Sequence, residues 1–318
     1  MSEMVLVTGA TGFVGSAVVA RLLADGVPVC AAVRLETTRF AGARTVRVAG
    51  LGASTEWRRA LDGCRAVVHC AARVHVMRDD ARDPLAEYRA VNVEGTIALA
   101  KQAAAVGARR FIFISSIKVN GEATALGTPF RASDHPHPVD PYGISKLEAE
   151  HALEELAATG ALDLTIIRPP LVYGPGVKAN FLSMARWIGR GVPLPFGGIT
   201  GNRRSFVALA NLVDLIVTCL HREAAVGQLF LVSDGEDLST AELLRRTAMA
   251  LGVAPRLAVV PATVLAAVVR VLGRPGLWQR LGGNLQVDAT PTYERLGWRP
   301  PVSLDEGLRA AVAELRGE

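Results

Sequence analysis

The chain has 318 residues, of which 50% are hydrophobic, 20% are charged and 5% are aromatic. This apolar content excludes a disordered chain, and a chain of this length buries a large core without disulfide bonds. The net charge of +5 comes from scattered residues with no run of five or six like charges, so we expect no nucleic-acid partner.

Strands and helices alternate in the first half of the chain. Short runs rich in Val, Ile and Phe predict strands that are buried on both faces. These strands are Met4–Thr8, Val29–Val33, Thr45–Val48, Ala66–Cys70, Phe111–Ser115 and Leu164–Arg168. Helical patterns over Ser16–Ala24, Pro84–Val106 and Pro141–Ala158 lie between them. The alternation predicts an α/β fold with a Rossmann-type, doubly wound parallel sheet.

After Arg168 the chain is dense in proline and glycine and carries shorter helices. We expect these helices at 180–190, 210–222, 239–251, 262–272 and 303–315. This change in composition and helix length predicts two parts, a dinucleotide-binding domain over 1–168 and a smaller, partly helical lobe over 169–318. Segments such as Gln228–Val232 are expected to return to the main sheet.

Cysteine usage and the apolar runs bear on the compartment. The four cysteines, at positions 30, 64, 70 and 219, lack any metal-ligand spacing, so we expect reduced thiols, no metal and a cytoplasmic location. The N-terminus has no signal-peptide pattern. The apolar run Thr263 to Leu272 is interrupted by Arg270 and is shorter than the ~20 residues of a membrane span, so no membrane insertion is expected.

A glycine-rich loop, Thr8–Gly15, joins the first strand to the first helix. Gly9 permits a tight turn, Gly12 lets a diphosphate approach the backbone, and Gly15 lets the helix pack closely. The helix N-terminus then offers free N–H groups to the phosphates. The cofactor-binding positions predicted here are Gly9, Thr11, Gly12, Phe13, Val14 and Gly15.

The end of the second strand bears on the choice of dinucleotide. Val33 is followed by Arg34 and not by the acid that holds the ribose hydroxyls of NAD, so NADP(H) is favoured over NAD(H). Stacking on adenine or a solvated surface position are the alternatives for Arg34.

Tyr142 and Lys146 share one helix face, since residues four apart are neighbours on a helix. An ammonium near a phenol lowers the phenol's pKa and fits it for acid–base work, and Lys146 also suits the nicotinamide ribose. Ser116, at the end of a predicted strand, is expected to polarise the reacting oxygen, and Ser115 to contact the cofactor; the two serines could exchange roles.

Three small or polar residues complete this set of cofactor contacts. Ala71 and Ala72 follow the fourth strand, and Asn92 lies in a predicted helix. The alternatives are a core position for Ala71 and a polar contact within the helix for Asn92.

These motifs, in this order, resemble the extended short-chain dehydrogenase/reductase family, in its nucleotide-sugar epimerase/reductase group. The segments 115–121, 168–176 and 194–197 resemble a branch of UDP-4-keto-6-deoxy-N-acetylhexosamine reductases and related UDP-glucose 4-epimerases. The resemblance implies a homodimer through the two long helices. Ser116-Ile117-Lys118 replaces the Thr-Asp-Glu of sugar dehydratases, so dehydration is not expected.

The resemblance also implies roles in the second lobe. Asn180 and Arg204 would bind the substrate diphosphate, with a surface salt bridge as the alternative for Arg204. Lys178 and Arg280 are weaker phosphate candidates. Ile117 would lie near sugar C6. The resemblance implies that Pro170 and Leu171 line the nicotinamide and that Pro169 also contacts the cofactor. It places Leu51, after Gly50, beside the adenine.

The function expected from this set is NADPH-dependent reduction at C4 of a UDP-4-keto-6-deoxy-hexosamine. The alternative is a UDP-hexose 4-epimerase with bound NAD. Two rivals from other classes are a reductase of small apolar ketones and a cofactor-sensing module without catalysis. The catalytic residues in the favoured reading are Ser116, Tyr142 and Lys146.

Overall fold

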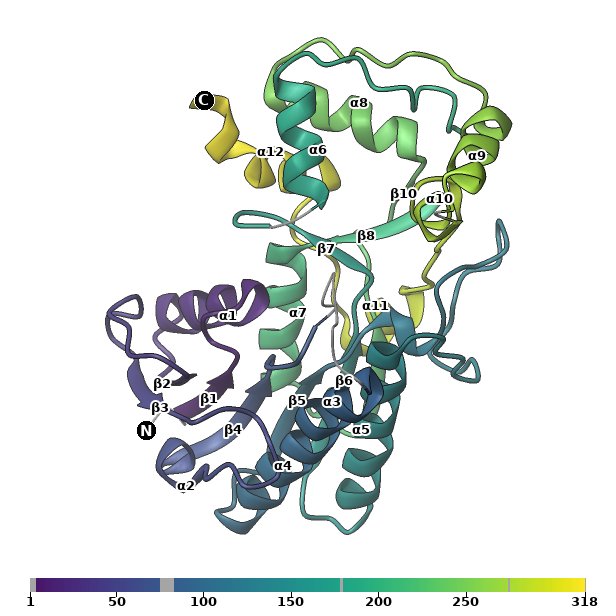
Figure 1. Cartoon of the computed structure of the whole chain (residues 1–318). Helices are drawn as coiled ribbons and strands as arrows, with labels where there is room; N and C mark the ends of the chain where they lie inside the picture. Colours follow the sequence, from purple (N-terminus) through teal and green to yellow (C-terminus); the bar gives the residue numbers. More distant parts are fainter. Residues whose placement is uncertain (1–3, 75–82, 178–179, 274, 318) are drawn as a thin grey trace.

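A seven-stranded parallel sheet forms the centre of the computed structural model, which describes residues 4–74, 83–177, 180–273 and 275–317 (Figure 1). The strand order is β3-β2-β1-β4-β5-β6-β9. The bounds are β1 Met4–Thr8, β2 Val29–Val33, β3 Arg44–Arg47, β4 Cys64–His69, β5 Arg110–Ile114, β6 Asp163–Arg168 and β9 Gln228–Leu231. The order turns back between β1 and β4, and ligands of such sheets bind at the carboxyl ends beside that point.

Two hydrophobic layers cover the sheet because successive strand residues point to opposite faces. Val5 and Val7 of β1 join one layer, and Leu6 joins the other. The first layer is covered by α1 (Phe13–Ala24), α7 (Leu209–His221) and α11 (Thr290–Leu296). The second layer is covered by α2 (Arg58–Leu61), α4 (Gly95–Ala105) and α5 (Pro141–Ala158). Burial on both faces is what the near-continuous apolar strands predict.

The long helix expected over Pro84–Val106 is interrupted. It consists of α3 (Pro84–Arg89), a π-helical segment over Ala90–Glu94, and α4. A π segment inserts an extra residue per turn and often lies at a functional site. The apolar periodicity therefore predicted a helix over this range but not its π-helical segment. Asn92 lies in that segment and is 1% exposed.

The smaller lobe contains a three-stranded sheet, β10-β8-β7, and several helices. Its strands are β7 Leu171–Tyr173, β8 Arg204–Ala208 and β10 Asp237–Leu238. Its helices are α6 Asn180–Gly189, α8 Thr240–Leu251, α9 Ala262–Val271, α10 Pro275–Gly282 and α12 Leu304–Ala311. Reciprocal Ser–Glu capping boxes begin α8 and α12. The sequence did not predict α10 or α11.

The chain passes repeatedly between the two parts. β9 joins the main sheet beside β6, as expected for Gln228–Val232, and α7 packs beneath the same sheet. The proposed boundary after Arg168 stays a prediction. Within the described residues, no helix is both long and apolar enough to cross a membrane, and no cluster of three or more His, Cys, Asp or Glu could hold a metal ion.

A buried ion pair fastens α5 to β6. Arg168 donates to both carboxylate oxygens of Glu150, with an Nε–Oε1 distance of 3.0 Å, and to Asn120 Oδ1 at 2.9 Å. Asn120 in turn donates to the carbonyl of Arg131. Both charges are removed from water, so each depends on the other for its stabilisation.

We expect Glu150→Ala to lower the free energy of unfolding by about 3–5 kcal/mol, because it leaves the Arg168 guanidinium buried without a counter-charge. The control is Asp163→Ala, which removes a solvent-exposed ion pair with Arg109 and should cost less than about 1 kcal/mol. Urea titration followed by circular dichroism measures both. Equal losses would contradict the role given to the buried pair.

Candidate active site

The glycine loop after β1 is closed by backbone contacts that leave no room for side chains. Gly9 has a positive φ of 63°, and a Cβ on it would lie 2.8 Å from the backbone nitrogen of Ala71. A Cβ on Gly15 would lie only 2.2 Å from the carbonyl oxygen of Gly9. Gly15 thus allows α1 to lie directly against the glycine loop. The contact that requires a glycine here is with the loop backbone and not with the strand.

The start of α1 presents unused backbone donors. Gly12 N–H donates to Gly9 O at 2.8 Å, and Ser16 N–H donates to Gly12 O at 3.0 Å. The amides of residues 13–15 have no helical carbonyl one turn before them to bond to. They are therefore free for a ligand at the positive end of the helix dipole. The geometry of this loop fits the diphosphate of a dinucleotide.

Two serines follow β5 at the same edge of the sheet. Ser115 is 3% exposed, and its hydroxyl has no hydrogen-bond partner among the described residues. An unpaired buried hydroxyl fits a bound group that supplies the missing partner. Ser116 accepts a hydrogen bond from the Lys118 amide at 3.3 Å and also interacts with the phenol of Tyr142. The structure therefore brings Ser116 and Tyr142 together.

The N-terminus of α5 is fixed against the turn that follows Ser116. Asp140 caps the helix by accepting from Gly143 N–H at 2.7 Å and also pairs with the Lys118 ammonium. A Cβ on Gly143 would lie 2.8 Å from the carbonyl oxygen of Lys118. Gly143, Asp140 and Lys118 were not singled out from the sequence. The signal that could have found them is an Asp-Pro capping pattern directly before Tyr142.

Burial, and not Lys146, sets the pKa of the Tyr142 phenol. Burial first and the Asp140 carboxylate second raise this pKa to about 12, while the hydrogen bond with Ser116 acts in the opposite direction. Lys146 is not among the groups that shift this pKa in the protein without a cofactor, so its effect on the pKa of Tyr142 stays a prediction. The Nζ of Lys146 lies 3.8 Å from the centre of the Phe113 ring.

Lys146 is itself strongly perturbed. The residue is 1% exposed, and burial lowers its pKa to about 7, although Glu150 and Cys70 act to raise it. The charge of an ammonium is weakly solvated by an aromatic face compared with water. Lys146 therefore changes charge near neutral pH, which is unusual for lysine and typical of functional sites.

Asn92 connects the loop after β4 to α5. Its Oδ1 accepts from Arg73 N–H at 2.8 Å, and its Nδ2 donates to Arg73 O and to Ser145 Oγ, both at 3.0 Å. Ser145 donates to the carbonyl of Tyr142 at 2.8 Å. These partners lie on two other segments and not within the helix of Asn92, so its polar contacts join segments, and its contact with a cofactor stays a prediction. Ser145, which is fully buried, was missed.

A second chain of hydrogen bonds supports the ends of β1 and β4. Thr8 Oγ1 and His69 Nδ1 are 2.6 Å apart, and His69 Nε2 and Thr96 Oγ1 are 2.9 Å apart. Burial lowers the pKa of His69 to about 3, so the imidazole is neutral. The Ala71 amide also donates to Thr8 Oγ1. His69 is thus the satisfied core residue that its apolar strand predicts.

Comparison with known proteins supplies the family. The model of the NAD dependent epimerase/dehydratase family matches residues 5–232, which include the glycine loop, both serines, Tyr142 and Lys146. The chain belongs to this family. Its sheet and helices are those of a Rossmann-type α/β fold, and the resemblance to extended short-chain dehydrogenases/reductases is confirmed.

Proteins with named activities resemble nearly the whole chain. A UDP-glucose 4-epimerase of Vibrio cholerae is 49% identical over 310 residues, covering 97% of this chain and 94% of the relative. A GDP-6-deoxy-D-mannose reductase of Pseudomonas aeruginosa is 28% identical, covering 99% and 97%. Among solved structures, MoeE5 in complex with UDP-glucose and NAD has a TM-score of 0.77 at 27% identity, covering 98% of each chain.

The remaining positions predicted for the cofactor of this epimerase/dehydratase chain differ in exposure. Those at the surface are Thr11, Gly12, Arg34 and Leu171. Those partly buried are Phe13, Val14, Leu51, Ala71 and Ala72. Pro169 and Pro170 are buried, and the Pro169 carbonyl accepts from Ile117 N–H at 3.0 Å. Leu51 packs on Gly95, where a Cβ would lie 2.7 Å from Leu51 Cγ.

The predicted substrate residues of the smaller lobe are placed unequally. Arg204, at the start of β8, is partly buried and donates to the carbonyls of Gln279 and Gly283 at 3.4 and 3.2 Å. Burial lowers its pKa. Ile117 is 4% exposed and packs with Leu231, so it supports the site from within the core. Asn180 begins α6, but its side chain and Lys178 lie outside the described part.

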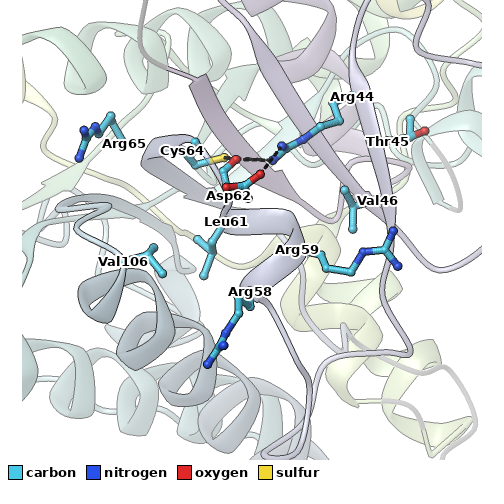
Figure 2. A pocket seen from close by; sticks show the side chains of 11 residues that line it. Arg44, Thr45, Val46, Arg58, Arg59, Leu61, Asp62, Cys64, Arg65 and Val106 are labelled. Carbon is cyan, nitrogen blue, oxygen red and sulfur yellow. Dashed lines mark hydrogen bonds and ion pairs between the residues drawn. The ribbon is translucent and has the colours of Figure 1, made fainter.

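The opposite edge of the sheet holds an arginine-lined hollow of about 730 Å³ (Figure 2). It lies at the amino ends of β3 and β4, where Arg44 contacts Cys64 Sγ at 3.9 Å. Figure 2 shows the side chains of Arg58, Arg59 and Arg65 pointing in different directions. They do not converge on one ligand, so the site we consider for this family member is at the carboxyl edge.

The pH dependence of stability tests the state of Lys146. Between its folded pKa of about 7 and its ordinary value of 10.5, the unfolded chain binds a proton that the folded protein lacks. The free energy of unfolding therefore rises with pH across this window. Relative to Lys146→Met, we expect the wild type to gain roughly 2–4 kcal/mol between about pH 6.5 and 9.5.

Urea denaturation at both pH values measures this gain. The matched control is Lys101→Met, which removes an exposed lysine of α4 and should leave the pH dependence as in the wild type. Parallel pH profiles for the wild type and Lys146→Met would show that Lys146 is not buried as an uncharged amine.

Proposed function

We propose that the protein is a UDP-hexose 4-epimerase that interconverts the two C4 configurations of its sugar with the help of a bound nicotinamide dinucleotide. The observation that carries this proposal is the 49% identity to a UDP-glucose 4-epimerase over 97% of the chain. The reductase favoured on the basis of Arg34 has weaker support, because the reductase relative is 28% identical. MoeE5, whose structure holds NAD, supports NAD(H) as the dinucleotide, and the preference for NADP(H) based on Arg34 stays a prediction.

The residues present fit the cofactor at three places. The glycine loop places no side chain at the N-cap of α1, Ser115 has a buried hydroxyl without a partner among the described residues, and Lys146 has a buried amine beside Phe113 of β5, the strand that Ser115 follows. We assign Ser115 and Lys146 to the nicotinamide half and the loop to the diphosphate. When bound, the cofactor supplies reversible hydride exchange with sugar C4.

The acid–base work falls to Tyr142. Its phenol is neutral in the protein alone, so it is ready to donate a proton to the oxygen at C4 of a 4-keto sugar. In the opposite direction the phenolate form of Tyr142 accepts the proton of the C4 hydroxyl and becomes the neutral phenol again. Ser116 lies beside this phenol and donates to the same sugar oxygen, and Asn92 with Ser145 holds the backbone of Tyr142 in place.

The substrate diphosphate is assigned to Arg204. Among the described residues Arg204 has carbonyl partners and no carboxylate, so its partly buried charge lacks a counter-ion. A guanidinium in this state favours an anion, and phosphate matches its paired N–H groups.

The activity is tested with UDP-glucose and UDP-N-acetylglucosamine in separate incubations with catalytic NAD. Proton NMR of the anomeric signals should show the C4 epimer of at least one sugar. Tyr142→Phe should reduce turnover by about 10²–10⁴-fold, because the proton donor is lost. The control Tyr293→Phe removes the hydrogen bonds of the Tyr293 phenol with the carbonyl and the hydroxyl of Ser233 and should retain turnover.

Two results would overturn the epimerase. One is stoichiometric NADPH consumption with a UDP-4-keto-6-deoxy-hexosamine and no epimer from either sugar, which identifies the reductase. The other is reduction of apolar ketones by a protein that binds no UDP-sugar.

The assignment of Arg204 is tested by Arg204→Gln. We expect KM for the UDP-sugar to rise by about 10–100-fold with a much smaller change in kcat, because the lost contact is to the non-reacting diphosphate. The neighbouring Arg203→Gln is the control, since Arg203 is directed to Glu242 at 3.5 Å. A fall in kcat with unchanged KM would place Arg204 outside the diphosphate site.

A further inference from the structure

One part of the smaller lobe has the composition of a surface that meets anions. Between Glu242 and Asp288 the sequence contains six arginines and no acidic residue. This stretch includes α9 and α10, which we call the α9–α10 hairpin. The stretch between Asp163 and Asp214 also lacks acidic residues, so it is its exposed apolar surface that sets the hairpin apart.

The hairpin exposes apolar side chains that a folded protein normally buries. No residue of α9 is buried, and α9 packs mainly on α10 at the outer edge of the lobe (Figure 1). Val264, Val268 and Val271 recur at helical spacing and are 49%, 50% and 87% exposed. Leu272 and Leu277 extend the same apolar surface at 67% and 43%. An exposed apolar patch of this kind marks a contact site.

We propose that the α9–α10 hairpin is a docking surface for a membrane that contains anionic lipids. Valines and leucines enter the interfacial region of the bilayer, while Arg270 and Arg280 face the negatively charged headgroups. The ten residues of α9 are too few to cross a bilayer, so the helix lies in the plane of the interface. Charge complementarity selects this occupant, because a second copy of the hairpin would bring arginines against arginines.

The hairpin is held rigidly to the rest of the lobe. Thr240 Oγ1 donates to the carbonyl of Leu281 at 2.5 Å, and Asn202 Nδ2 donates to the carbonyls of Leu281 and Gly283. Arg204 donates to Gln279 O and Gly283 O in the same turn. Docking therefore positions the lobe as one body, with Arg204 directly behind the membrane-facing helix pair.

Vesicle flotation of the full chain tests this surface. The probes are vesicles of phosphatidylcholine alone and of equal parts phosphatidylcholine and phosphatidylglycerol. We expect binding to the mixed vesicles at low and physiological ionic strength, weakened by high salt, and at least tenfold weaker binding to the neutral ones. Val264→Ser/Val268→Ser/Val271→Ser should reduce binding to mixed vesicles by about tenfold or more, because the apolar contact is lost.

Charge variants give an independent readout. Arg270→Gln and Arg280→Gln should each weaken binding to mixed vesicles by about fivefold. The matched controls are Arg58→Gln with Arg65→Gln, at exposed arginines of the opposite sheet edge, and Leu126→Ser, at a leucine that is 60% exposed outside the hairpin. These controls should bind as the wild type does. Circular dichroism confirms that each variant is folded.

Three results would overturn the docking surface. They are wild-type protein that binds neither vesicle, equal binding to neutral and mixed vesicles, and hairpin variants that bind like the controls. Sedimentation velocity without lipid identifies the competing occupant. A dimer that the triple serine variant converts to monomer, in a protein that ignores vesicles, would assign the hairpin to contact between copies. None of these outcomes depends on epimerase turnover.

Discussion

The close approach of α5 to the turn after β5 is the contact on which the candidate site depends. Ser116 and Tyr142 belong to different segments, and they meet because Gly143 lets the helix backbone lie against the carbonyl of Lys118. Asp140 then bonds to both sides of the junction, to the Gly143 amide and to the Lys118 ammonium. A larger residue at position 143 would move the phenol away from the serine hydroxyl, whatever the identity of the catalytic side chains.

The same helix carries a row of polar groups that lie against the sheet, of which Lys146 and Glu150 are each 1% exposed. Tyr142, Lys146 and Glu150 follow one another at intervals of four residues on the face toward the sheet. Glu150 is neutralised by Arg168, and Lys146 faces the Phe113 ring without an ion pair of its own in the described structure. The charge of Glu150 is thus balanced within the protein. The amine of Lys146 has no such partner, so a bound ligand can change its protonation. This division explains how a buried polar helix face is both stable and reactive.

Regular patterns in the sequence predicted the frame well. The strands Met4–Thr8 and Val29–Val33 and the helix Pro141–Ala158 have the expected bounds, because buried parallel strands and capped helices have strong local signals. The glycine loop and the pairing of Ser116 with Tyr142 were also predictable. The π-helical winding at Asn92 and the direction of Lys146 were not, because both depend on contacts between segments far apart in sequence. The apolar run at 262–272 was read as an ordinary helix of a packed lobe, and only the structure shows that its valines face outward.

The interleaved path of the chain has a consequence for synthesis. β6 is completed at Arg168, yet its outer neighbour β9 is made only after another 59 residues, and α7 reaches its sheet face just before that strand. Until then a nascent chain carries an open parallel edge and an uncovered apolar face, both of which invite wrong partners. The main sheet is therefore completed only after the first part of the smaller lobe has been made, and chaperones have a defined surface to protect during that interval.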